Sequence, residues 1–192
     1  MELIQTKNLL TKEEEDHFKS KEFWNYFPFY YLVDPTPTAE GYSNFGSLSH
    51  TLVNRWYEYG ESSPTVNSDS YKFFKELFDR FCDINDIQYT RVLRMALNLT
   101  MNISAEFIAA PHVDHILPHN LCILYLNDSG GPTVFFKQKW EEGAIFDIEK
   151  SEIIEESHPE MGKMIQADGG HYHTARPCEQ DTYRLVMVLT YN

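Results

Sequence analysis

Basic residues are scarce in this chain. Its 192 residues contain 16 Lys and Arg against 29 Asp and Glu, which gives a formal net charge of −13. Nucleic acids are recognised through clustered positive charge, so this balance argues against nucleic acid as a partner. A local basic groove is still compatible with it, and solubility is the simplest role of the excess acid.

Cysteines are few, and the sequence has no long apolar run. Cys82, Cys122 and Cys178 lie far apart, which fits neither a disulfide framework nor a zinc ribbon and indicates a reducing compartment. The N-terminal residues lack the apolar core of a signal peptide, and no run approaches the ~20 apolar residues of a membrane helix. We therefore expect a cytoplasmic protein, of the producing or a host cell, without membrane association.

The composition is that of an ordinary globular chain. Apolar residues make up 42% of it and aromatic residues 15%, which is enough for one sizeable core. We expect a single domain over residues 1–192. Residues 1–90 would supply helical support and substrate loops, and residues 91–192 a β core.

Helical patterns occur in the first 90 residues. Thr11 precedes three glutamates, as is typical of a helix N-terminus. Residues 52–59 repeat apolar side chains at helical spacing, and residues 70–82 do so most clearly, with an aromatic stripe that we expect to be buried. Residues 27–33 are more strand-like and end before a proline-rich turn.

From residue 89 the apolar pattern changes to a period of two. Residues 89–102 alternate, with Arg94 and Asn98 on one side and Leu97 and Leu99 on the other. Further short strand-like runs cover residues 106–112, 121–126, 133–136, 144–148, 161–167, 170–175 and 184–191. Eight short strands separated by turns predict a mainly β fold with N-terminal helices, arranged as a double-sheet jelly roll or barrel.

The tripeptide His112-Val113-Asp114 offers two metal ligands two residues apart. A second histidine would complete the two-His, one-carboxylate facial triad of non-haem Fe(II) oxygenases. Taken alone, the tripeptide is more often a surface histidine beside a turn aspartate. His115 and His119 crowd the same turn, as further polar neighbours of the site or as solvent-facing groups.

Two candidates for the second histidine lie in the strand at 170–175. His171 and His173 are two residues apart, and a regular strand directs such residues to the same face. The strand pattern therefore does not choose between them, and either could instead line the sheet surface.

Arg184 opens an almost wholly apolar strand. A buried guanidinium without a partner is costly, so the fold must either expose Arg184 or supply an anion, such as a dicarboxylate held through two parallel hydrogen bonds. The Tyr125 hydroxyl could bond to the same carboxylate. The alternatives are a salt-bridged Arg184 at a strand end and a core tyrosine whose hydroxyl is satisfied elsewhere.

These pieces occur in a recognisable order: HVD, CILYLN, GGPTVFF, PEMGKMIQADGGHYH and an arginine in the last strand. Residues from about 92 to 192 resemble the double-stranded β-helix (jelly roll, cupin-like) of the Fe(II)/2-oxoglutarate-dependent dioxygenases. The resemblance is greatest to the prolyl-4-hydroxylase-like branch, which includes small phage-encoded members. The first ~90 residues are similar only in kind, as helical support.

The resemblance implies roles for individual residues. His112, Asp114 and His173 would be the catalytic metal ligands, because the family places its last histidine about ten residues before the carboxylate-binding base. Arg184 and Tyr125 would hold the distal carboxylate of 2-oxoglutarate.

Three further residues carry weaker assignments. By the same resemblance, Asn98 would approach the co-substrate near the metal. His171 is an unusual second histidine beside the expected ligand. Arg176 could compete for the anion.

The reaction implied by the resemblance consumes 2-oxoglutarate and dioxygen, releases succinate and CO2, and hydroxylates a substrate. Peptidyl proline is the first candidate substrate, a small molecule or free amino acid the second, and nucleic acid the third. The candidate substrate loops cover residues 34–49, 60–68, 115–120 and 138–143. Two other functions stay open: a non-catalytic metal-binding jelly-roll module, and a cupin-type metal enzyme that does not use 2-oxoglutarate.

Overall fold

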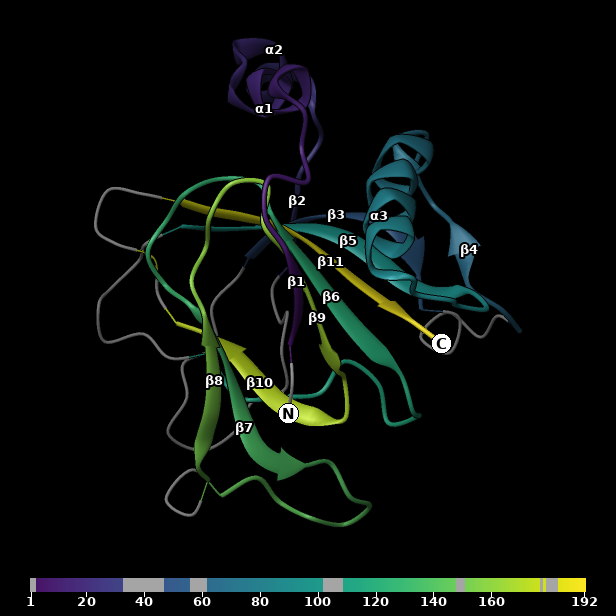
Figure 1. Ribbon diagram of the computed structural model, residues 1–192, viewed down its shortest axis with the longest axis vertical. Helices are drawn as coiled ribbons and strands as arrows, with labels where there is room; N and C mark the ends of the chain where they lie inside the picture. The colour runs from purple at the N-terminus through teal and green to yellow at the C-terminus, as the bar shows by residue number, and fades with distance from the viewer. Residues whose placement is uncertain are drawn as a thin grey trace.

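The computed structural model of the chain describes residues 3–32, 47–55, 62–101, 109–147, 151–176, 178 and 183–192. Within these residues two antiparallel sheets dominate, and three helices accompany the larger sheet (Figure 1). None of the helices in the described parts of the chain is long and apolar enough to cross a bilayer.

The larger sheet has eight strands. In spatial order its strands are β1 (Ile4–Thr6), β9 (Met164–Asp168), β6 (Asn120–Tyr125), β11 (Tyr183–Tyr191), β5 (Val92–Met101), β3 (Ser47–Asn54) and β2 (Tyr30–Leu32), with β4 (Thr65–Val66) also paired to β3. The smaller sheet has the order β10 (His171–Ala175), β7 (Thr133–Lys139) and β8 (Ile153–Ser157). The mainly β, double-sheet fold expected from the sequence is therefore confirmed.

The three helices are α1 (Lys12–Lys19), α2 (Lys21–Tyr26) and α3 (Tyr71–Asn85). Thr11 begins α1 in a capping box, because its hydroxyl accepts from the Glu14 amide and the Glu14 carboxylate accepts from the Thr11 amide. The helix predicted for residues 70–82 is confirmed as α3, and it ends at Asp86 in the left-handed conformation, with a φ of 53°.

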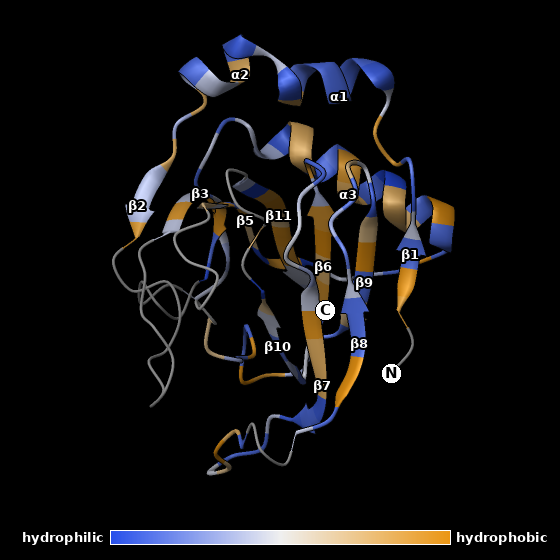
Figure 2. Ribbon diagram, turned by 90° about the vertical axis from the view of Figure 1, so that its left-hand side faces the viewer, coloured by the Kyte–Doolittle hydropathy of each residue, from blue (hydrophilic) through white to orange (hydrophobic). Residues whose placement is uncertain are grey.

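The two faces of the large sheet pack against different partners. Met95, Leu97 and Leu99 of β5 share one core with the aromatic stripe of α3, on the face that the helices cover (Figure 2). On the opposite face, Tyr125 of β6 packs with Phe135 of the small sheet. Strand alternation thus produces three layers, and the space between the two sheets holds the polar groups discussed below.

Some of the secondary-structure predictions were wrong. Residues 109–111 form no strand, and His112 makes only an isolated bridge with His173. Residues 52–54 belong to β3 and not to a helix. Leu52 and Val53 are both buried in this strand, which has strand partners on each side. The prediction failed because consecutive buried residues imitate helical spacing. Residues 144–147 form no strand, and Ile145 is 88% exposed. The strand partner of β7 is instead Ile153–Ser157. The predictions for residues 56–59, and for 106–108 of the 106–112 run, fall outside the described residues.

Candidate active site

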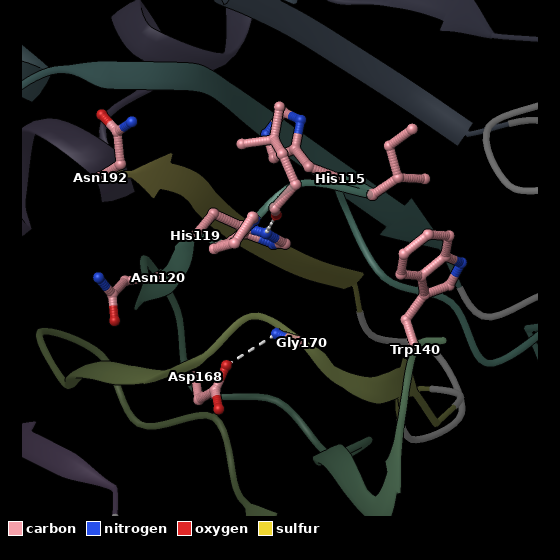
Figure 3. A pocket seen from close by; sticks show the side chains of 10 residues that line it. His115, His119, Asn120, Trp140, Asp168, Gly170 and Asn192 are labelled. Carbon is pink, nitrogen blue, oxygen red and sulfur yellow. Dashed lines mark hydrogen bonds between the residues drawn. The ribbon is translucent and has the colours of Figure 1, made fainter. Parts of the chain in front are cut away.

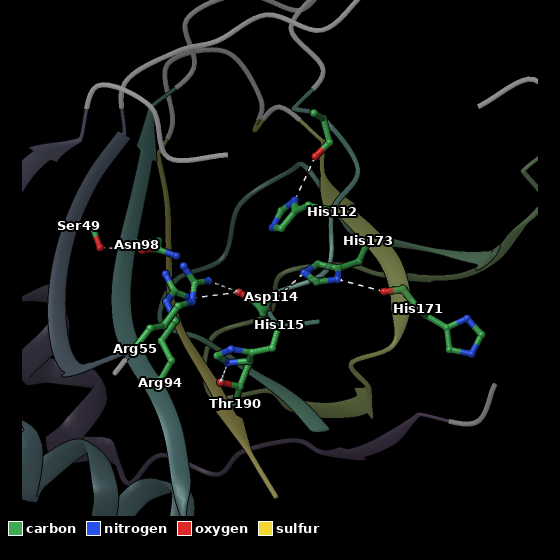
Figure 4. A network of polar contacts seen from close by, with 11 residues as sticks. Ser49, Arg55, Arg94, Asn98, His112, Asp114, His115, His171, His173 and Thr190 are labelled. Atoms are coloured by element: carbon green, nitrogen blue, oxygen red, sulfur yellow. Dashed lines mark hydrogen bonds and ion pairs between the residues drawn. The ribbon is translucent and has the colours of Figure 1, made fainter. Parts of the chain in front are cut away.

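The tripeptide His112-Val113-Asp114 connects the two sheets. The backbone of His112 exchanges two 3.0 Å hydrogen bonds with His173 of β10 in the small sheet. Asp114 contacts Arg94 of β5 in the large sheet. The next residue, His115, places its Nε2 2.7 Å from the Thr190 hydroxyl of β11 (Figure 4). The candidate ligands are therefore held between the sheets by anchors on both.

His173 and Asp114 direct ligand atoms toward one another. His173 Nε2 lies 3.5 Å from Asp114 Oδ2. The Nδ1 atom of His112 lies 3.0 Å from the backbone carbonyl oxygen of Ala110, and the Nδ1 atom of His173 lies 3.4 Å from that of His171. A carbonyl only accepts, so Nδ1 carries the hydrogen and Nε2 keeps its lone pair. Histidines that bind metals are commonly oriented in this way.

Burial sets the charge of these groups. Burial lowers the pKa of the His173 imidazole to about 4, so the ring is neutral at physiological pH, as a metal ligand must be. Burial opposes ionisation of Asp114, but the charge of Arg94, with other cationic neighbours, outweighs it and holds its pKa well below the ordinary value. Asp114 is therefore a carboxylate at physiological pH.

A β-bulge separates the two histidines that the strand pattern could not distinguish. His171 pairs with Lys139 and His173 with Phe135, so the register of β10 against β7 shifts between them. The His171 ring lies on the other side of β10 from Asp114, with its Nδ1 2.8 Å from the Phe136 carbonyl (Figure 4). Of the two histidines, only His173 directs its ring toward Asp114.

The donor set of His112, Asp114 and His173 fits a divalent metal ion. Two ligand atoms at right angles around a metal, each about 2.1 Å from it, lie about 3 Å apart, close to the 3.5 Å between His173 Nε2 and Asp114 Oδ2. The ring centroids of His112 and His173 are 4.7 Å apart. Among the described residues, no three His, Cys, Asp or Glu side chains are already grouped closely enough to hold a metal. The side chains must therefore close slightly around an ion.

Arg184 is buried beside two hydroxyl groups. Its side chain is 5% exposed, and its Nη2 donates to the Thr133 hydroxyl at 2.7 Å. Its Nε is buried without a hydrogen-bond partner, and no carboxylate among the described residues pairs with it. Burial lowers the pKa of Arg184 from its ordinary value, yet guanidinium groups stay protonated in proteins. This arrangement suits an incoming carboxylate.

Tyr125 completes the surroundings of Arg184. Its hydroxyl lies 3.0 Å from the Thr133 hydroxyl and 3.0 Å from the Ser157 carbonyl. Its ring contacts two cations, with Arg184 Cζ 5.6 Å and Lys163 Nζ 5.1 Å from the ring centroid. Two positive groups around one buried phenol give the surroundings of Arg184 a positive potential.

Strand β7 contacts both Arg184 and His173. Thr133 and Phe135 are two residues apart on β7, and a strand directs such residues to the same face. Thr133 binds Arg184, and the ring of Phe135 lies 5.8 Å from that of His173. Since a strand rises about 3.3 Å per residue, the two contacts are separated by about 7 Å along β7. The metal ligand His173 and the cationic group of Arg184 therefore lie between the sheets at a separation that a short molecule could span.

Solved structures with this arrangement of strands are known. No protein-family model and no curated protein matches the sequence. An oxidoreductase of the 2OG-Fe(II) oxygenase family from Burkholderia pseudomallei has a TM-score of 0.66 to this chain, 13% identity, and coverage of 99% of this chain and 84% of its own. The chain has the fold of the 2-oxoglutarate-dependent oxygenases.

Two more structures with the oxygenase fold differ in what they bind. A prolyl hydroxylase from Trichoplax adhaerens in complex with a hypoxia-inducible-factor peptide has a TM-score of 0.60, 12% identity, and coverage of 98% and 82%. The epimerase SnoN in complex with Fe3+, α-ketoglutarate and nogalamycin RO has a TM-score of 0.58, 12% identity, and coverage of 98% and 78%. At such identity the likeness establishes the fold alone.

The remaining predicted residues make other contacts. Asn98 is on β5, where its Oδ1 accepts from the Ser49 hydroxyl at 2.9 Å, and its approach to a co-substrate stays a prediction. Arg176 is 47% exposed and pairs with Glu156 at 2.8 Å. His119 is buried, with its Nδ1 2.8 Å from the Leu117 carbonyl.

Sequence reasoning missed three residues of the site: Thr133, Arg55 and Arg94. Arg94 had a readable signal, because it occupies an apolar strand just as Arg184 does. Arg55 follows β3, which the spacing had assigned to a helix. Thr133 had no signal of its own, since a threonine in a strand is ordinary.

A pocket of about 600 Å³ opens beside the loop that follows Asp114. His115, His119 and Trp140 line it, together with Asp168 at the end of β9 (Figure 3). It is therefore lined by two of the loops that the sequence suggested for substrate, residues 115–120 and 138–143.

Proposed function

We propose that this protein is an Fe(II)- and 2-oxoglutarate-dependent oxygenase. His112, Asp114 and His173 would hold the metal, and Arg184 and Tyr125 would hold the distal carboxylate of 2-oxoglutarate. The reaction would use dioxygen, release succinate and CO2, and hydroxylate a bound substrate. The fold of the chain is compatible with this chemistry.

The observation that carries the proposal is the placement of Thr133 and Phe135 on one face of β7. Thr133 contacts a buried arginine that has no acidic partner among the described residues, and Phe135 contacts the His173 ring. A 2-oxo acid with a second carboxylate fits both groups, because its 2-oxo acid end would bind the metal at His173 and its far carboxylate would form a charge-assisted pair with Arg184.

Fe(II), when bound, would supply the activation of dioxygen. The side chains around it position and protect. Arg184 and Thr133 fix the far end of the co-substrate, which orients its other end toward His173. Phe135 and the buried face of β6 exclude water from the space between the sheets. The neutral imidazole of His173 presents Nε2 as a ligand without first losing a proton.

Metal-dependent co-substrate binding tests the proposal. Calorimetry with Mn(II), which avoids oxidation, should show 2-oxoglutarate binding to the metal-loaded protein and much weaker binding to the metal-free protein. Asp114→Ala should abolish the metal-dependent part. Equal binding with and without metal would contradict the proposal.

The choice of histidine is tested in the same titration. His173→Ala should lose metal-dependent binding, whereas His171→Ala should keep most of it because the His171 ring lies on the other side of β10 from Asp114. The opposite result would move the third ligand to His171.

For the substrate, our first candidate is a prolyl residue of a peptide. The supporting observations are the peptide-bound prolyl hydroxylase among the similar structures and the exposed edge strand β2, where Tyr30 and Tyr31 are 62% and 66% exposed. The predicted lid aromatics Tyr42 and Phe45 lie outside the described residues.

A small molecule is the second candidate, because SnoN shares the fold and its complex contains nogalamycin RO. Substrate-stimulated succinate release separates the two. Proline-containing peptides should stimulate release if the first candidate is right, and free amino acids or other small molecules if the second is right.

A non-catalytic metal module and a cupin-type enzyme without 2-oxoglutarate stay as alternatives. Neither needs a buried cation next to the metal ligands, and Arg184 is therefore the residue that argues against both.

A further inference from the structure

Two arginines contact the same oxygen of Asp114. Arg55 Nη2 lies 3.0 Å and Arg94 Nη1 lies 3.3 Å from Asp114 Oδ1. The other oxygen, Oδ2, is the one that faces His173 Nε2 at 3.5 Å. The carboxylate thus has an arginine side and a histidine side (Figure 4).

The fold brings both arginines to this place. Val53 of β3 pairs with Met95 of β5, so Arg55 and Arg94 lie at the same end of this strand pair. Their side chains are 20% and 16% exposed, against 4% for Asp114. Both are therefore held among packed groups, and a guanidinium so held keeps a fixed direction toward its acceptor.

The division of the carboxylate has a consequence for metal binding. A carboxylate binds a metal ion through one oxygen or through both, and binding through both occupies an additional coordination position. Oxygenase chemistry on a facial triad depends on positions that the protein leaves open. A carboxylate that used both oxygens would therefore remove a position needed by the co-substrate or by dioxygen.

We infer that Arg55 and Arg94 are positioning residues that hold Asp114 Oδ1 away from the metal, so that Asp114 binds through Oδ2 alone. This inference rests on the proposed function, because it concerns the same metal site. Hydrogen bonds to a ligating group are a general means of fixing its orientation. Here one donor, Arg94, lies on β5, and the other, Arg55, directly follows β3.

The test counts the water molecules on a bound metal. Water-proton relaxation of the Mn(II)-loaded protein, measured without co-substrate, reports how many exchangeable waters the ion keeps. In the Arg55→Met/Arg94→Met variant, Asp114 should bind through both oxygens and displace about one water, so the relaxation enhancement should fall by about a third. Arg176→Met, which removes an exposed arginine, should match the wild type.

The outcomes separate this inference from the proposed function. A double variant that binds Mn(II) and keeps the wild-type relaxation overturns the positioning role while leaving the oxygenase proposal intact. A wild-type protein that does not bind Mn(II) contradicts the oxygenase proposal itself.

Circular dichroism establishes first that the double variant folds. If it does not, a crystal structure of the Mn(II)-loaded wild type decides. Asp114 bound through one oxygen, with the other still on the arginines, supports the inference. Two bound oxygens, or arginines withdrawn from Asp114, overturn it.

Discussion

Replacing Arg184 by methionine should change stability and co-substrate binding in opposite directions. In the protein without co-substrate, Arg184 is 5% exposed, its Nε is unpaired, and its Nη2 donates a hydrogen bond to the neutral hydroxyl of Thr133. Keeping a cation in such a place costs free energy, and replacing buried charges by apolar groups of similar volume is often neutral or stabilising by about 1–4 kcal/mol. The free energy of unfolding of Arg184→Met should therefore equal or exceed that of the wild type.

Binding should suffer from the same change. Removing one partner of a buried charge pair costs about 2–5 kcal/mol, and a loss of about 2.7 kcal/mol corresponds to a ~100-fold weaker Kd for 2-oxoglutarate. At a ligand concentration of about 100 times the wild-type Kd, co-substrate stabilises the wild type by about 2.7 kcal/mol and the variant by only about 0.4 kcal/mol.

Thermal unfolding of the Mn(II)-loaded proteins, with and without 2-oxoglutarate, measures both effects at once. Arg176→Met is the matched control, since Arg176 is 47% exposed and pairs with Glu156. An Arg184→Met protein that binds 2-oxoglutarate with wild-type affinity would refute the reasoning. A strongly destabilised variant would also refute it, because Arg184 would then be structural.

Three further predictions concern other parts of the chain. Gly169→Ala should lower stability by about 1–3 kcal/mol in thermal unfolding, because a Cβ there would lie 2.3 Å from the buried His119 ring; an unchanged Tm would contradict this. Tyr125→Phe should weaken 2-oxoglutarate binding about tenfold in calorimetry, through loss of one hydrogen bond; a reduced Tm with unchanged Kd would make the hydroxyl structural. Glu14→Gln should lower the free energy of unfolding by about 1 kcal/mol at pH 7, because Glu14 forms an ion pair with Arg80 through two hydrogen bonds, and this pair lowers the pKa of Glu14. The wild type should lose this advantage as the pH falls below 4.5, the ordinary pKa of a glutamate. A difference in stability that does not change with pH would contradict this prediction.

The sequence predicted the β core well where strands alternate cleanly. The alternation of apolar residues identified β5, whereas β11 was identified as an almost wholly apolar run. β3 was missed because Leu52 and Val53 are adjacent and both buried in the core on the helix-covered face. The register of β3 against β5 shifts between Thr51 and Val53, so the alternation that marks a strand is interrupted there.

The sequence predicted those site residues whose charge or polarity conflicts with the apolar residues around them. Arg184 conflicts with its apolar strand, and the structure places it without an acidic partner among the described residues. The choice between His171 and His173 depended on how β10 lies against β7, whose register shifts between the two residues without leaving a local pattern in the sequence. Arg55 and Asp114 are 59 residues apart, and only the paired strands show that they meet.

The central claim is that Fe(II) and 2-oxoglutarate bind together at His112, Asp114 and His173. Anaerobic addition of Fe(II) and then 2-oxoglutarate to the wild-type protein measures this directly, because a 2-oxo acid chelated to Fe(II) produces a weak visible charge-transfer band. The account predicts the band in the wild type and its loss in His173→Ala. A folded wild-type protein that shows no band would contradict it.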